Sequence, residues 1–159
     1  MLQNDSARKR ASHFKQALCA NMKILYLQLP PDLKLPDIFE LGPFRSVVII
    51  EDIVAEEWQS KVSDWLVASG CLYMMAWGKN CSSWDDSVDY SNLEEFAYGD
   101  IPEDKFVMTT WHDNEPLKDV YFFSKYNAAH PAVEIDNTLL LHISRYNKEK
   151  EFLIDYESA

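Results

Sequence analysis

Short, almost wholly apolar segments alternate with longer amphipathic ones from residue 44 onward, and this alternation constrains the fold more than any other feature of the sequence. Runs without polar alternation are typical of strands that are buried on both faces of a parallel sheet. We expect four such strands, at 47–50, 71–77, 106–111 and 138–143. An additional segment, 23–29, could form an edge strand, and the tail at 152–154 could add a strand or a helical turn.

The segments between these strands carry helical signals. Residues 55–69 place apolar side chains on one helical face, and Gly70 follows as a C-terminal cap. After the second strand, a polar loop is expected up to a short helix from Asn92, because residues 91–94 resemble a capping box. A third helix is expected after the third strand, with Pro116 in its first turn and an end at Pro131.

Strand and helix alternation of this kind predicts an α/β fold. We expect a single three-layer domain with a mostly parallel sheet of four to five strands and helices on both faces, a Rossmann-like arrangement. Residues 44–159 form this domain. Residues 1–43 form a basic helical extension, with a helix at 5–20, and a proline-rich connector at 30–43.

Composition limits the class of protein. Apolar residues make up 47% of the 159 residues, which is enough for a substantial core, but no run is long enough to span a membrane. The amino-terminal region has no apolar core of a secretory signal. Three cysteines without a paired spacing argue against a disulfide framework, so a cytoplasmic location is expected.

The formal charge of −11 is concentrated after the first 45 residues. A chain this acidic is not expected to bind nucleic acid through general electrostatics. Residues 80–115 contain ten acidic residues and one lysine, interleaved with large aromatic residues. This pattern predicts a recognition face for a basic protein partner, and the alternative is a solvated acidic face over ordinary core aromatics.

Ligands of parallel α/β sheets bind beyond the carboxyl ends of the strands. Three loops that follow the first three strands should therefore meet at one corner. Their polar and aromatic residues are candidate binding residues: Asp52, Lys79, Asn80, Ser82, Ser83, Trp84, Asp85, Asp86, Asp89, Trp111 and Glu115.

A catalytic alternative uses the same corner. Cys81 could be a nucleophile, His112 its base, and Asp113 or Asp52 the group that orients the base. No signature of a cysteine hydrolase surrounds Cys81, so a packed structural thiol is the competing interpretation. No cofactor is expected, because the chain lacks a glycine-rich phosphate loop, and no metal-ligand spacing is present.

Three stretches carry a family resemblance: residues 71–78 (CLYMMAWG), residues 81–89 (CSSWDDSVD), and residues 109–116, which begin TTWH and end Glu-Pro. Together they resemble a small bacterial protein family, over roughly residues 25–143. The resemblance implies a bacterial, cytosolic origin and no particular chemistry.

These observations predict one of two function classes. The first is a protein-interaction domain, such as an immunity or defence-associated factor, that binds a basic partner through residues 80–115. The second is a small enzyme or ligand-binding domain with a Cys/His/Asp site at the carboxyl ends of the strands.

Overall fold

Five parallel strands form the central sheet in the computed structural model, which describes residues 24–159. The strands are β1 (Ile24–Leu29), β2 (Phe44–Ile50), β3 (Cys71–Gly78), β4 (Met108–His112) and β5 (Asn137–Ile143). Their order across the sheet is β1-β5-β2-β3-β4, and each neighbouring pair is parallel. The predicted parallel sheet is therefore confirmed, with β1 at one edge, as expected for that segment, and β4 at the other.

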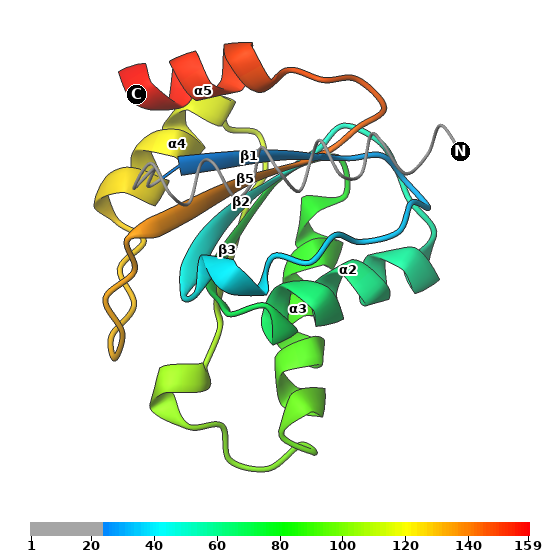
Figure 1. The fold of residues 1–159 in the computed structure, drawn as a ribbon, viewed down its shortest axis with the longest axis vertical. Coiled ribbons are helices and arrows are strands. Elements are labelled where there is room, and N and C mark those ends of the chain that lie inside the picture. The colour runs from blue at the N-terminus through cyan, green and yellow to red at the C-terminus, as the bar shows by residue number, and fades with distance from the viewer. Residues whose placement is uncertain (1–23) are drawn as a thin grey trace.

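Helices cover both faces of the sheet, which confirms the expected three-layer α/β architecture (Figure 1). They are α2 (Glu56–Ala68), α3 (Cys81–Glu95), α4 (Leu117–Tyr126) and α5 (Glu149–Ser158), with two 3₁₀ turns at Phe39–Leu41 and Glu103–Lys105. Helices α2 and α3 pack on one face, and α4 and α5 on the other (Figure 1). The chain advances from β2 to β4 toward one edge and then returns from β4 to β5, and right-handed crossovers in opposite directions place α2 and α3 on one face and α4 on the other.

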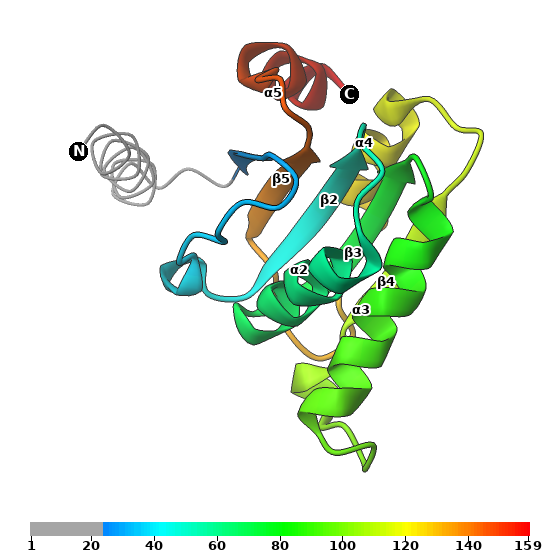
Figure 2. The ribbon, with the colours of Figure 1, turned by 90° about the vertical axis from the view of Figure 1, so that its right-hand side faces the viewer.

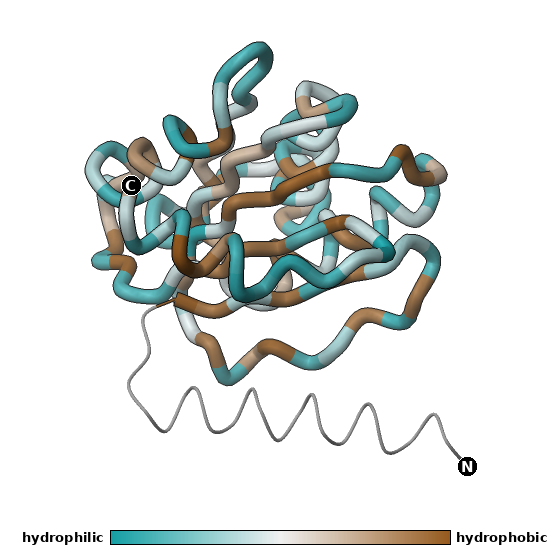
Figure 3. Tube along the Cα trace, turned by 90° about the horizontal axis from the view of Figure 1, so that it is seen from above, coloured by the Kyte–Doolittle hydropathy of each residue, from teal (hydrophilic) through white to brown (hydrophobic). Residues whose placement is uncertain are grey.

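The core is made of two apolar layers, one on each side of the sheet. Alternate residues of β2 face opposite layers: Val48 and Ile50 pack beneath α2 and α3, whereas Val47 and Ile49 pack beneath α4 and α5. Hydrophobic residues accordingly concentrate along the strands, and hydrophilic residues along the turns (Figure 3). A strand buried on both sides cannot alternate polar with apolar residues, which is why these segments are continuously apolar.

The region after β3 differs from the prediction. The expected polar loop and short helix from Asn92 are wrong, because one continuous helix, α3, begins at Cys81. Its buried face includes Cys81, Trp84 and Val88, spaced three and four residues apart. The serines and aspartates between them conceal this spacing in the sequence. The predicted capping box lies in the last turns of the helix, where Asn92 bonds the loop before β4 instead.

Other boundaries shift less. The third predicted strand begins two residues later, at Met108, and the helix after it ends at Tyr126 rather than near Pro131. Pro116 precedes that helix as its N-cap residue. The tail is a complete helix, α5, rather than a strand. The helix predicted at 5–20 lies outside the described residues.

The proline-rich connector between β1 and β2 lies against α2. The indole nitrogens of Trp58 and Trp65 donate hydrogen bonds to the carbonyl oxygens of Leu33 and Pro36, at 3.3 and 2.7 Å. The connector therefore lies along α2 without secondary structure of its own, apart from one 3₁₀ turn. Among residues 24–159, no helix is long and apolar enough to cross a membrane.

Candidate functional site

The loops that follow β2, β3 and β4 lie side by side, as the parallel topology predicts. The backbone N–H of Lys79 donates to the carbonyl oxygen of Ile50 at 2.9 Å, which joins the first loop to the second. The indole nitrogen of Trp77 donates to the carbonyl oxygen of Glu115 at 2.7 Å, which joins the second to the third. The expected corner at the carboxyl ends of the strands is therefore present.

The Cys81 thiol lies within this corner but is not activated. The side chain is 3% exposed in the apolar layer beneath α3. Burial raises the pKa of this thiol, and the nearby carboxylate of Asp113 raises it further. A raised pKa keeps the sulfur protonated at neutral pH, whereas a nucleophilic cysteine needs the thiolate.

The His112 ring lies on the opposite face of the sheet from Cys81. It packs edge-on against Phe123 of α4, with ring centroids 5.1 Å apart. Its Nε2 lies 3.0 Å from Thr110 Oγ1, and its Nδ1 lies 3.2 Å from Glu115 Oε2. No hydrogen bond joins this ring to the Cys81 sulfur, so the structure brings the Cys81 and His112 backbones together without forming a nucleophile and base pair.

The predicted binding residues differ in their exposure. Trp84 and Asp85 are buried, at 1% and 6% exposed, and Trp84 is a core residue that cannot contact a partner. Ser83 is partly buried and serves the fold: it donates to the carbonyl oxygen of Asn80 and accepts a hydrogen bond from Gln59. Asp52 is partly exposed after β2. The remaining predicted residues are exposed: Lys79, Asn80, Ser82, Asp86, Asp89, Trp111, Asp113 and Glu115.

We call the exposed side chains of residues 80–115 the acidic surface. It extends over α3, the loop after it and β4, at the edge of the sheet that has no further strand (Figure 2). Exposed aromatic rings accompany the carboxylates: Tyr90, Tyr98, Phe106 and Trp111. The hydroxyl of Tyr98 donates to that of Tyr90 at 2.8 Å, and the two rings pack edge to face, so this pair has a defined position although it is exposed.

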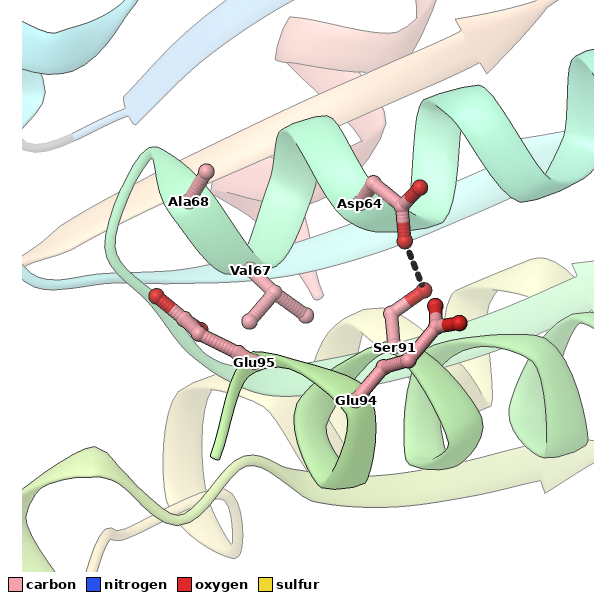
Figure 4. Close-up of a pocket in the computed structure, with 6 residues that line it drawn as sticks. All are labelled: Asp64, Val67, Ala68, Ser91, Glu94 and Glu95. Atoms are coloured by element: carbon pink, nitrogen blue, oxygen red, sulfur yellow. Dashed lines mark hydrogen bonds between the residues drawn. The ribbon is translucent and has the colours of Figure 1, made fainter. Parts of the chain in front are cut away.

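A shallow cleft of about 320 Å³ adjoins the acidic surface, between the last turns of α2 and α3 (Figure 4). Three carboxylates line it, those of Asp64, Glu94 and Glu95, and the hydroxyl of Ser91 donates to Asp64 at 2.7 Å. No lysine or arginine lines the cleft. Its chemistry therefore extends the negative charge of α3 toward α2 and suits a basic group.

A second polar cluster, which the sequence did not indicate as a site, lies at the carboxyl ends of β5 and β2. The chain crosses back here from β4 to β5, so this is the point where the strand order reverses. Tyr26 Oη lies 2.7 Å from His142 Nδ1 and accepts the backbone N–H of Lys148 at 3.0 Å. Glu51 Oε1 accepts a hydrogen bond from Lys148 Nζ at 2.7 Å, and Glu51 Oε2 lies 3.2 Å from His142 Nε2.

The protonation states in this cluster follow from burial and partners. Burial lowers the pKa of His142, which is fully buried, below its ordinary value. The pKa of the Glu51 carboxyl is lowered: its partial burial opposes this shift, and its contacts with Lys148 and His142 outweigh the burial. These contacts join β1, β5, the end of β2 and the start of α5. Sequence analysis missed it, because its members come from four separate segments.

Acidification is expected to destabilise the fold through His142. The pKa of His142 in the folded chain is below 6.5, so as the pH falls the unfolded chain takes up a proton at this histidine before the folded chain does. The free energy of unfolding should therefore fall as the pH drops below about 6.5 toward the folded-state pKa. Urea unfolding between about pH 7.5 and about pH 5.5 measures this slope. His142→Gln removes the titration and should flatten the profile. Equal slopes for the two proteins would contradict this assignment.

Comparison with family models identifies residues 24–159 as a match to the family described as Domain of unknown function (DUF7684). Comparison with curated proteins finds no match, and neither does comparison with solved structures. The matched range coincides with the described part of the chain, from the first residue of β1 to the end of α5 and the terminal residue. The chain therefore belongs to the DUF7684 family.

Proposed function

We propose that this protein is an interaction domain that binds a basic, extended segment of a protein partner through the acidic surface. One observation carries the proposal: the sheet edge at β4 coincides with exposed aromatic rings and with nine exposed carboxylates against a single exposed lysine. Each feature occurs alone on many proteins. Their coincidence on one edge supports a docking role.

The position of β4 at the edge of the sheet supports a partner that binds in an extended conformation. Within residues 24–159, the outer side of β4 has no neighbouring strand, so its backbone groups are available to another chain. Many interaction domains bind an extended peptide by adding it to such an edge. The half-exposed rings of Phe106 and Trp111 flank the two ends of β4 and would anchor apolar or cationic side chains of that peptide.

The charge supports a basic partner. Carboxylates spread over α3 and the loop before β4 attract lysine and arginine over a distance of about one Debye length, which speeds encounter at low salt. Free thiols at Cys71 and Cys81 are typical of a reducing compartment. We therefore include in the proposal a bacterial cytoplasmic setting and an immunity or defence role, in which this domain captures a basic protein.

The test measures binding of a synthetic peptide of alternating lysine and threonine to the full chain, with a glutamine and threonine peptide as a neutral comparison. Glu94, Glu95 and Glu103, changed together to Gln, should weaken lysine-peptide binding about tenfold and reduce its salt dependence. Glu149, Glu151 and Glu157 of α5 are the matched control. Their change to Gln alters the net charge equally on the other face of the sheet and should have a much smaller effect.

Two results would contradict the proposal. If the wild-type chain binds the lysine and glutamine peptides equally, charge does not select the partner. If the acidic-surface and α5 triple variants lose the same affinity, the attraction is general and the acidic surface is not a site.

A further inference from the structure

Asp85 is a buried carboxylate without a sufficient set of partners. The residue lies on α3, is 6% exposed, and its Oδ1 atom is buried and accepts no hydrogen bond. Within residues 24–159, no lysine, arginine or histidine forms an ion pair with it. An unpaired buried carboxylate is costly, so its presence in a folded protein calls for an explanation.

The groups around Asp85 have the chemistry of a cation site. Asp89 follows one helical turn later, and Thr109 of β4 donates a hydrogen bond to Asp89 Oδ1 at 2.7 Å. Burial, followed by the charge of Asp89, raises the pKa of Asp85, while Thr109 acts in the opposite direction. Because Asp85 and Asp89 are four residues apart on α3, both carboxylates lie on the side of the helix that faces β4. Among the described residues, no ion pair joins either carboxylate to a lysine, arginine or histidine.

An aromatic side chain lies on the same face of β4 as Thr109. Trp111 lies two residues after Thr109, so the two side chains project from the same face of β4, the face that α3 covers. Its ring is half-exposed, whereas the neighbouring β4 residue His112 faces α4. The face of an indole ring attracts a cation and covers the aliphatic part of a long side chain.

We propose that Asp85, Asp89, Thr109 and Trp111 form a subsite that receives the cationic side chain of one lysine or arginine of the bound partner. The assignment rests on the proposed function and deepens it, because it names the group of the partner that is recognised. The exposed carboxylate of Asp89 accepts hydrogen bonds from the cation, whose charge also compensates the buried carboxylate of Asp85, and the Trp111 ring packs against its stem.

A cationic side chain fits this subsite better than a metal ion does. Two carboxylates and one hydroxyl supply few of the roughly six to eight oxygen ligands that Ca²⁺ takes. Among the described residues, no group of three or more His, Cys, Asp or Glu side chains is placed to hold a metal. An indole ring is no ligand for a hard cation, whereas it contributes directly to binding of an ammonium or guanidinium group.

The subsite predicts opposite effects on binding and on stability. Asp85→Asn keeps the shape of the side chain and removes its charge. In the full chain, this variant should bind the lysine and threonine peptide about tenfold more weakly. It should also raise the melting temperature, because a buried unpaired charge is removed. Asp86→Asn is the matched control on the same helix: Asp86 is exposed, so binding should fall no more than about threefold and the melting temperature should not change.

The outcomes separate the subsite from the proposed function. If the triple variant of Glu94, Glu95 and Glu103 weakens binding but Asp85→Asn behaves like Asp86→Asn, the acidic surface stands and the subsite is overturned. An Asp85-dependent increase in melting temperature with Mg²⁺ or Ca²⁺ would overturn it in favour of a metal site. Trp111→Ala should also weaken binding of the lysine peptide, and of an arginine and threonine peptide. Unchanged binding of both peptides by Trp111→Ala would contradict the aromatic part of the subsite.

Discussion

Trp84→Ala is expected to lower the free energy of unfolding by about 3–5 kcal/mol, which is the range for removing a large buried aromatic side chain. Trp84 is 1% exposed and is among the largest fully buried side chains of the described region. It packs from α3 into the same apolar layer as Val62 and Leu66 of α2. Its loss would leave a cavity beneath α3 that these neighbours can fill only in part. Urea unfolding followed by circular dichroism measures the change.

Trp111→Ala is the natural control for this prediction, because both tryptophans belong to the stretch that the sequence presented as one candidate face. Trp111 is 54% exposed, so its removal should change stability by no more than about 0.5 kcal/mol. Equal losses for the two variants would show that Trp111 is also part of the packed core. A small loss for Trp84→Ala would contradict the placement of α3 on the sheet.

Gly78→Ala is expected to destabilise the fold by about 3 kcal/mol or more, from positive φ together with overpacking. Gly78 ends β3 with φ of +104°, a conformation that L residues rarely adopt. An added Cβ would also collide with the carbonyl oxygen of Ile50 in β2. The added Cβ is fixed to the backbone of β3 and the oxygen belongs to the backbone of β2, so the junction between β3 and α3 would have to separate from β2. Thermal and urea unfolding measure the loss.

Gly42→Ala separates the two causes. Gly42 also has positive φ, at +66°, but a Cβ there would meet no atom within 4 Å. This variant should lose only the contribution of backbone strain, about 1–3 kcal/mol. The additional loss in Gly78→Ala measures the close approach of β3 to β2. If Gly42→Ala is the more destabilising of the two, the close approach at Gly78 is not the main constraint.

Several elements could be predicted from the sequence because their signals are local. Continuous apolar runs at 47–50 and 71–77 identify strands buried on both faces, and both strands are present. The helix at 55–69 follows from apolar spacing and a terminal glycine. The stretch 79–91 misled the prediction, because serines and aspartates favour turns when they are considered without their surroundings. The buried positions of α3 become visible only when the helix lies on the sheet.

The candidate site also combines features that the sequence predicts with features that only packing decides. The negative charge and the aromatic content of residues 80–115 are properties of composition, and they indicated a recognition face directly. Which side chains remain on that face depends on packing: Trp84 faces the core, while Trp111 is half-exposed beside the edge of β4. Sequence reasoning also could not find the Tyr26 and His142 contact, since 116 residues separate the two.

By itself, the sequence determined the alternation of strands and helices, the parallel sheet and the location of the negative charge, because periodicity and charge depend on residues close together along the chain. Tertiary structure alone decided the order of the strands, the burial of Asp85 without a counter-ion from residues 24–159, and the separation of Cys81 from the His112 ring. Those features depend on which face of the sheet each side chain occupies, and that is decided when distant segments bury their apolar surfaces together.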